Sequence, residues 1–138
     1  MFPQVPDALR IGRIGELITA ASIEQAGFAA AQVPHEGFDI VCFDNEKSYR
    51  IEVKSASHPI DTSYRFMTSR GSKSKKLLSS DHCDIVAFCA IDQRKVAFRP
   101  VTKITLKKTR VKPQEFEESE MLSLMRAMKE VDLRREND

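Results

Sequence analysis

Three charged side chains, Asp39, Glu52 and Lys54, interrupt two stretches of sequence that otherwise consist of strand-forming residues. The polar segment 44–47 lies between these stretches and predicts a turn joining strands 38–43 and 48–55. Side chains alternate along a strand, so Glu52 and Lys54 share one face. Carboxylates suit a divalent cation, and an adjacent ammonium stabilises charge that develops on a phosphate.

The turn also predicts the register of this hairpin. If Phe43 pairs with Ser48, or position 44 with position 47, Asp39 faces Glu52 across the two strands. Directly opposed residues have Cβ atoms about 4.5–5.5 Å apart, and like charges at that distance destabilise a sheet. A positive charge is therefore expected between the two carboxylates.

Lys54 is one source of that charge. It lies diagonally from Asp39 and can pair with either acid, so one interpretation is a structural triad at a solvent-facing strand edge. The apolar neighbours indicate burial, however, and two buried carboxylates with one ammonium leave an uncompensated charge that costs several kcal/mol per ion. Magnesium takes one or two protein carboxylates and keeps several waters, which matches two opposed acids in a partly open cleft.

Composition restricts the class of protein. The 138 residues are 41% hydrophobic and 30% charged, which fits one globular domain. No apolar run reaches the ~18 residues of a membrane helix, and the N-terminus lacks the features of a secretory signal. Cys42, Cys83 and Cys89 form an odd set without C-x-x-C spacing, which indicates buried free thiols in a reducing compartment. We expect a cytoplasmic protein, without a membrane partner and without a metal site at His82 and Cys83.

Two acid-free stretches carry most of the positive charge in the middle of the chain. Residues 65–76 and 94–112 contain many lysines and arginines, although the formal net charge is only +2. Such a run is usually a solvated surface, but two runs of one sign on a shared face indicate a polyanion partner. Nucleic acid is the first candidate.

The remaining pattern predicts an α/β fold in which a small mixed sheet is flanked by an N-terminal and a C-terminal helix. The first helix spans 7–26, ends at Gly27 and has Glu16 beside its apolar positions, which are Leu9, Ile14, Leu17, Ile18 and Ala21. The last helix spans 115–135, with a core or subunit-contact face formed by Met121, Leu124, Met125, Met128 and Val131. Further strands are expected at 28–33, 63–68, 84–91 and 96–100, and a mobile surface loop at 69–80.

Three short segments resemble the PD-(D/E)xK nuclease superfamily, whose signature is an acid followed at a loose interval by acid, any residue and lysine. They are Gly15-Glu16, Gly37-Phe38-Asp39 and Glu52-Val53-Lys54. The first helix and hairpin are similar to archaeal-type Holliday junction resolvases. Tyr64-Arg65-Phe66 and the strands over 84–91 and 95–101 look more like phage and group I intron-associated endonucleases. The proline that the family has before its first acid is replaced here by Phe38.

The resemblance implies that residues 1–138 form a single nuclease domain with a restriction-endonuclease-like core. Asp39 and Glu52 would hold Mg²⁺, which Mn²⁺ can replace, with the carbonyl of Val53 as a third ligand. Glu16 would reach the site through a metal-bound water. Lys54 would orient the attacking water and offset charge on the phosphate.

The basic residues after the second strand of the hairpin would line the entrance and contact the DNA backbone, which positions a substrate without reading its sequence. These residues are Arg65, Ser69, Arg70, Lys73, Lys75 and Lys76. Tyr64 and Phe66, which alternate with Arg65, are assigned to the core. Residues 103–112 form a second, weaker patch.

The resulting hypothesis is a metal-dependent DNA endonuclease in a bacterial or phage-infected cell, acting on duplex or branched DNA as a homodimer. A Holliday junction resolvase is the first candidate. A sequence-specific homing or restriction-type endonuclease is the second candidate within the same class. Two further classes stay open, namely a DNA-binding module with a decayed site and a structural protein with a buried ion network.

Overall fold

The computed structural model describes residues 7–34, 37–71 and 75–138. Along the chain the elements are α1 (Asp7–Gln25), β1 (Ala29–Gln32), β2 (Ile40–Phe43), β3 (Ser48–Ala56), β4 (Tyr64–Met67), β5 (Ser69–Arg70), β6 (Lys76–Leu77), β7 (Ile85–Ala90), β8 (Lys95–Pro100), the 3₁₀ turn η1 (Val101–Lys103), β9 (Lys108–Val111), the 3₁₀ turn η2 (Pro113–Glu117) and α2 (Glu120–Asn137). None of the helices in these ranges combines the length and apolar character needed to cross a membrane.

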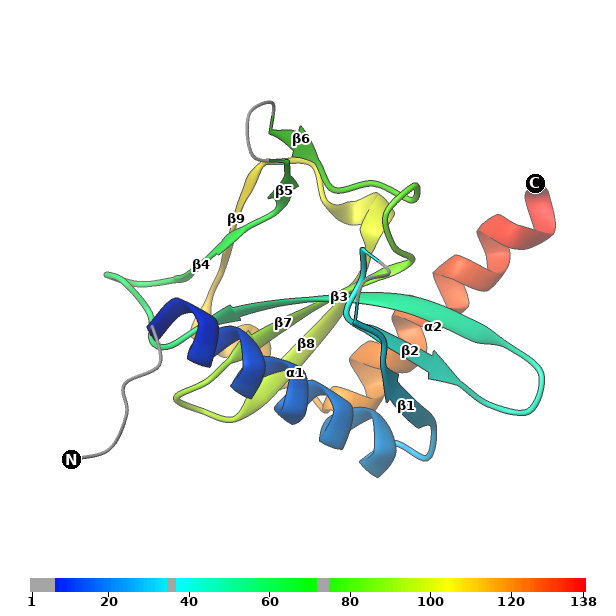
Figure 1. Cartoon of the computed structure of the whole chain (residues 1–138), viewed down its shortest axis with the longest axis horizontal. Coiled ribbons are helices and arrows are strands. Elements are labelled where there is room, and N and C mark those ends of the chain that lie inside the picture. The colour runs from blue at the N-terminus through cyan, green and yellow to red at the C-terminus, as the bar shows by residue number, and fades with distance from the viewer. Residues whose placement is uncertain (1–6, 35–36, 72–74) are drawn as a thin grey trace.

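Five strands form the central sheet in the order β1-β2-β3-β7-β8 (Figure 1). The β3–β7 pair is parallel and the other pairs are antiparallel, so the sheet is mixed. All six residues of β7 are buried, as expected for a central strand that is covered on both faces. The predicted α/β fold class is therefore confirmed.

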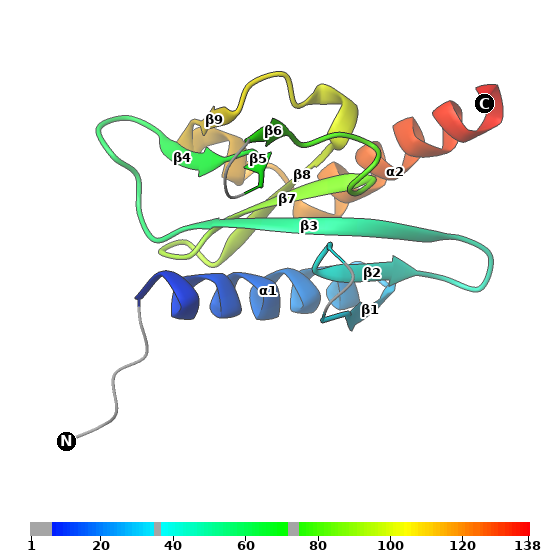
Figure 2. The same cartoon turned by 45° about the horizontal axis from the view of Figure 1, so that its top comes forward.

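Both helices pack against one face of this sheet, and the β4–β9 pair covers the other face (Figure 2). Ile23 of α1 and Leu124 of α2 share a core with Ile51 of β3. On the opposite face, Phe88 of β7 packs in a second core that includes the buried aromatic rings of β4. Glu52 and Lys54 alternate with Ile51, so their side chains point toward the β4–β9 side of β3.

The buried face of α1 differs from the predicted one. Leu9 and Leu17 are 52% and 60% exposed, while the helix turns small residues toward the sheet. A Cβ on Gly15 would lie 1.8 Å from the Ser55 hydroxyl oxygen, so this glycine allows the helix to approach β3 closely. Hydrophobic periodicity failed here because the contact is made by small side chains.

The last helix begins at residue 120 and not at residue 115. Ser119 caps it by accepting a hydrogen bond from the backbone N–H of Leu122, and the preceding residues form η2. The predicted methionine face is divided, since Leu124, Met128 and Val131 are buried while Met121 and Met125 are about half exposed.

Two other segments differ from the sequence prediction. The basic stretch after residue 103 contains β9, which pairs with β4, and the expected loop 69–80 contains β5 and β6. Positions 72–74 of that loop lie outside the described residues. The three cysteines are buried and free, as predicted.

Candidate active site

The β2–β3 hairpin brings Asp39 next to Glu52. The observed pairs run from Phe43↔Ser48 to Ile40↔Ile51, which confirms the predicted register, and position 52 comes next opposite position 39. Asp39 lies one residue before β2, and its N–H still donates to the carbonyl of Ile51 at 3.0 Å. β2 begins at Ile40, which pairs with Ile51, while β3 continues to Ala56, so the rest of β3 has an edge without a β2 partner.

The side chain of Asp39 is held at this edge by β3. The N–H of Val53 donates to Asp39 Oδ2 at 2.7 Å. The carbonyl of Ile51 faces β2, and residues two apart in a strand direct their backbone groups to the same side. The carbonyl of Val53 therefore also points to the edge where Asp39 lies.

Glu52 and Lys54 form an ion pair on the same face of β3. Lys54 Nζ lies 3.3 Å from Glu52 Oε2, and Glu52 is only 8% exposed. A carboxylate buried to this degree needs such a cation, because desolvation disfavours its charged form. Lys54 was expected to pair with either acid, and the observed ion pair is with Glu52.

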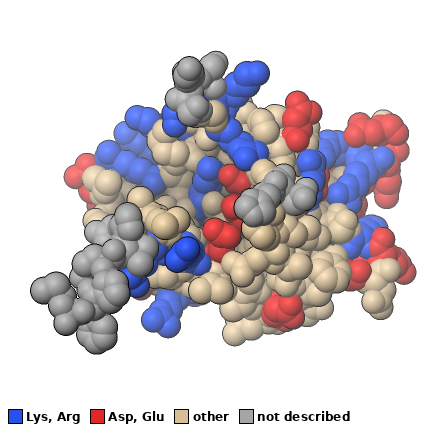
Figure 3. Space-filling view, in the orientation of Figure 1, with Lys and Arg blue, Asp and Glu red and all other residues tan. Residues whose placement is uncertain are grey.

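Helix α1 brings a third carboxylate to the site. Glu16 follows Gly15, whose close contact with Ser55 fixes this turn of the helix against β3. A cavity of about 570 Å³ is lined by several charged side chains, namely Arg13, Glu16, Asp39, Glu52 and Arg70. Acidic atoms near the middle of the face in Figure 3 are bordered by basic atoms.

The electrostatics show that the three carboxylates repel one another. Burial raises the pKa of Glu52, and the negative charge of Asp39 raises it further. Burial also raises the pKa of Asp39, against the lowering effects of the Val53 N–H, Lys54 and Arg70. The pKa of Glu16 is raised by burial and then by the charges of Asp39 and Glu52. Lys54 and Arg70 thus compensate the acids only in part.

The donor atoms at this site fit a hard divalent cation. Mg²⁺ prefers oxygen ligands and takes one or two protein carboxylates, and two carboxylates and a carbonyl meet here. Among the described residues, no hydrogen bond or ion pair engages Asp39 Oδ1 or Glu52 Oε1. The described ranges contain no group of three or more His, Cys, Asp or Glu side chains arranged to hold a metal.

The residues expected to contact DNA are distributed over two regions. Arg70 lies in the cavity, and Arg65 lies on the outer face of β4 with Asp61 3.2 Å away. Lys75 and Lys76 are exposed, whereas position 73 lies outside the described residues. Ser69 is 8% exposed and its hydroxyl oxygen is buried, so the structure does not bring it to the surface as expected.

Two cavity residues were not found by sequence reasoning in their observed role. Arg13 precedes Glu16 by three residues on α1, and this helical spacing could have indicated it. Arg70 was expected only at the entrance, but its charge reaches both Asp39 and Glu52. The short strand β5, which positions Arg70, has no clear sequence signal.

No protein-family model and no curated protein sequence matches the chain. Among solved structures, the bacterial homing endonuclease I-Ssp6803I is similar over 86% of this chain and 93% of its own, with 14% sequence identity and a TM-score of 0.71. The chain has the same fold as this endonuclease. Hjc, a Holliday junction resolvase from Archaeoglobus fulgidus, is similar over 77% of this chain and 87% of its own, with 20% identity and a TM-score of 0.48. At that TM-score the likeness to Hjc supports no further conclusion.

This shared fold agrees with the resemblance to PD-(D/E)xK nucleases seen in the sequence. Three charged residues of that motif, Asp39, Glu52 and Lys54, meet at one edge of β3, and Glu16 lies in the same cavity. One fold can host many reactions, so the reaction depends on these side chains.

Proposed function

We propose that residues 1–138 form one nuclease domain that hydrolyses phosphodiester bonds of DNA with Mg²⁺, for which Mn²⁺ can substitute. The observation that carries this proposal is the meeting of Asp39, Glu52 and Lys54 at the edge of β3, with Glu16 in the same cavity. The burial and mutual repulsion of the carboxylates are the conditions under which a divalent cation would be held most strongly.

Asp39, Glu52 and the carbonyl of Val53 would hold the cation. When bound there, it would polarise a phosphoryl oxygen and lower the pKa of a water molecule. The Lys54 ammonium, fixed beside Glu52, orients the attacking water and stabilises the charge that grows on the phosphate. Glu16 accepts a hydrogen bond from water in the cavity, and Arg70 attracts the phosphate.

A duplex-cutting endonuclease is the favoured activity. I-Ssp6803I is a homing endonuclease, and its similarity extends over most of both chains. The Holliday junction resolvase activity expected first from the sequence has no comparable support. The four-way junction in the substrate panel described below tests for that activity.

Cutting both strands of a duplex in a single binding event is achieved by two active sites, so we propose that the protein acts as a homodimer. Exposed apolar side chains of α2 provide a surface for this contact, namely Met121, Leu122, Met125 and Leu133. Sedimentation should show a concentration-dependent dimer, and a monomer at high concentration would contradict this part of the proposal.

Cleavage of a panel of DNA substrates tests the proposed function. Supercoiled plasmid, linear duplex and a four-way junction are incubated with the full chain and Mg²⁺. We expect cleavage of duplex DNA that is abolished by Asp39→Asn and Glu52→Gln. Glu46→Gln, at the exposed tip of the same hairpin, is the matched control and should remain active.

Different results of this panel would identify the competing functions. Paired symmetric nicks restricted to the four-way junction would instead establish a resolvase. DNA binding without cleavage and without any effect of Mg²⁺ would indicate a decayed site. Weak binding that does not change with salt would favour a structural ion network, because phosphate contacts give a steep salt dependence.

A further inference from the structure

The β4–β9 pair is a two-stranded ribbon with one buried and one exposed face. Tyr64 and Phe66 of β4 and Val111 of β9 are at most 2% exposed and anchor the ribbon on the sheet. The outer face carries exposed side chains of Arg65, Met67, Lys108 and Arg110. We call these four residues the outer ribbon face.

Two like charges oppose each other on this face. Arg65 pairs directly with Arg110 across the ribbon, and Met67 pairs with Lys108. Opposed like charges destabilise a sheet, so the pair needs a negative partner. Asp61 lies 3.2 Å from Arg65, but it is highly exposed and such a pair contributes little. No ion pair or hydrogen bond involves the Arg110 side chain within the described ranges.

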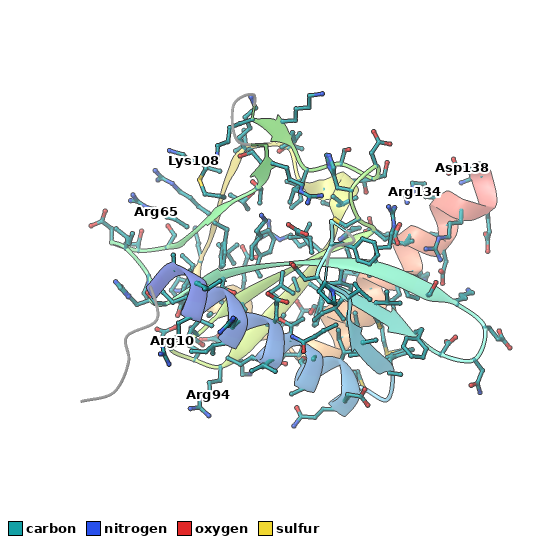
Figure 4. All side chains as sticks on the ribbon, viewed as in Figure 1. Arg10, Arg65, Arg94, Lys108, Arg134 and Asp138 are labelled. Carbon is teal, nitrogen blue, oxygen red and sulfur yellow. The ribbon has the colours of Figure 1, made fainter. Side chains whose placement is uncertain are left out.

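The two-stranded shape of the ribbon fits the major groove of DNA. The major groove of B-DNA is about 12 Å wide and admits a two-stranded β-ribbon. A cavity of about 300 Å³ lies among the side chains of the outer ribbon face, and a second cavity of about 300 Å³ adjoins Lys108 and Arg110. Arg65 and Lys108 project from the ribbon on the same side of the molecule (Figure 4), over a region where basic atoms gather in Figure 3.

Hydrogen bonds at the end of the ribbon connect it to the strand that leads into the candidate active site. Thr68 follows β4, donates its N–H to the carbonyl of Lys107 at 2.8 Å and is hydrogen-bonded to the hydroxyl of Thr109 at 2.9 Å. The next strand, β5, carries Arg70 into the cavity of Asp39 and Glu52. A duplex whose phosphate lies in that cavity therefore has the ribbon close to its adjoining groove.

From this arrangement we propose that the outer ribbon face enters the major groove of duplex DNA and that Arg65 and Arg110 read guanine edges there. The proposal rests on the proposed function and adds a specificity-determining surface to it. Arginine forms a bidentate contact with O6 and N7 of guanine, while Met67 provides an apolar surface for a thymine methyl group. Lysine has a point ammonium in place of the planar fork, so Arg→Lys would keep the charge and weaken the contact with O6 and N7.

Selection from a random duplex library, followed by methylation interference, tests this proposal. The full chain is used with Ca²⁺, and bound DNA is probed for guanines whose N7 methylation prevents binding. We expect such guanines for the wild type and their loss in Arg65→Lys and Arg110→Lys, with about 5- to 150-fold less discrimination at each position. Arg94→Lys, the same exchange at an exposed arginine in the turn between β7 and β8, should leave the pattern intact.

Contact of the ribbon with phosphates alone would give a different set of results. A ribbon that contacts only phosphates would give no N7 interference, and the Arg→Lys variants would bind all sequences as well as the wild type does. Arg→Ala variants would then lose affinity uniformly and lower the salt slope by about one. Absence of N7 interference in the wild type, unchanged sequence preference in the Arg→Lys variants, or absence of DNA binding would each overturn the proposal.

The failure of this proposal can be separated from failure of the proposed function. Cleavage with Mg²⁺ but without N7 interference rejects groove reading and leaves the nuclease intact. N7 interference without cleavage supports groove reading and rejects the nuclease activity.

Discussion

Gly15 of α1 lies so close to Ser55 of β3 that a Cβ at position 15 would stand 1.8 Å from the serine oxygen and 2.9 Å from its Cβ. This contact sets the distance between the helix and the strand. Glu16 and Lys54 are the chain neighbours of these two residues, so the same contact positions one charged side chain from each element. The site therefore depends on a glycine that carries no chemistry itself.

Gly15→Ala should destabilise the protein. The added methyl group must displace Ser55 or the helix, and overpacking of this kind costs about 1–3 kcal/mol. Gly12→Ala is the matched control in the same helix, because nothing lies within 4 Å of a Cβ there. That variant should gain about 0.5–1 kcal/mol from helix propensity. Urea denaturation measures the free energy of unfolding of both variants. Equal stability of Gly15→Ala and Gly12→Ala would contradict the close contact between Gly15 and Ser55.

Stability without metal should fall as the pH rises. The pKa values of Glu16, Asp39 and Glu52 are raised in the folded protein above their ordinary values of 4.5, 3.8 and 4.5. The folded state therefore holds protons that the unfolded chain releases, and this contribution is lost as the pH rises through the raised values.

Urea denaturation between pH 4 and pH 8 in a chelator measures this dependence. Asp39→Asn should flatten it, because the variant removes one raised carboxyl and the charge that repels the other two. The Glu46→Gln control should retain the wild-type slope. A variant Asp39→Asn with an unchanged slope would show that the acids do not interact as described.

Arg70 should extend the activity toward lower pH. Its charge lowers the pKa of both Asp39 and Glu52, so Arg70→Ala should shift the acidic limb of the pH–rate profile to higher pH. Arg70→Lys keeps the charge and should leave the limb near its wild-type position. Single-turnover cleavage across pH gives the profile, and a limb that does not move in Arg70→Ala would count against this coupling.

Glu16→Gln should slow cleavage without abolishing DNA binding. Glu16 lines the cavity and is proposed to act through a metal-bound water, so its loss should slow cleavage about 10- to 100-fold. Rates at saturating Mg²⁺ and DNA measure the effect. A loss as complete as that in Asp39→Asn would instead indicate a direct ligand.

The hairpin could be predicted from the sequence because its signals are local. The polar turn at 44–47 and the alternation of charged with apolar residues fix the register, and the structure agrees from Phe43↔Ser48 to Ile40↔Ile51. The contributions of Arg70 and β9 could not be predicted in this way. The two-residue strand β5 gives no periodicity, and β9 is a basic segment whose pairing with β4 depends on residues far away in the chain.

The face of α1 shows a different limit of sequence reasoning. Amphipathic patterns favour large apolar side chains for the core, so Leu9 and Leu17 were placed there and are exposed. The helix instead uses Gly15 and other small residues to lie close to β3. Near the site the helix is placed by close packing of small residues, while Ile23, further along α1, is buried in the core.

Calorimetric titration of the full chain with Mg²⁺ and Mn²⁺ at pH 8 tests the central claim most directly, because it measures whether Asp39 and Glu52 together hold a divalent cation. We expect binding by the wild type and by Glu46→Gln, and its loss in Asp39→Asn and in Glu52→Gln. Absence of binding in the wild type, or uptake that persists when both carboxylates are replaced, would contradict the account.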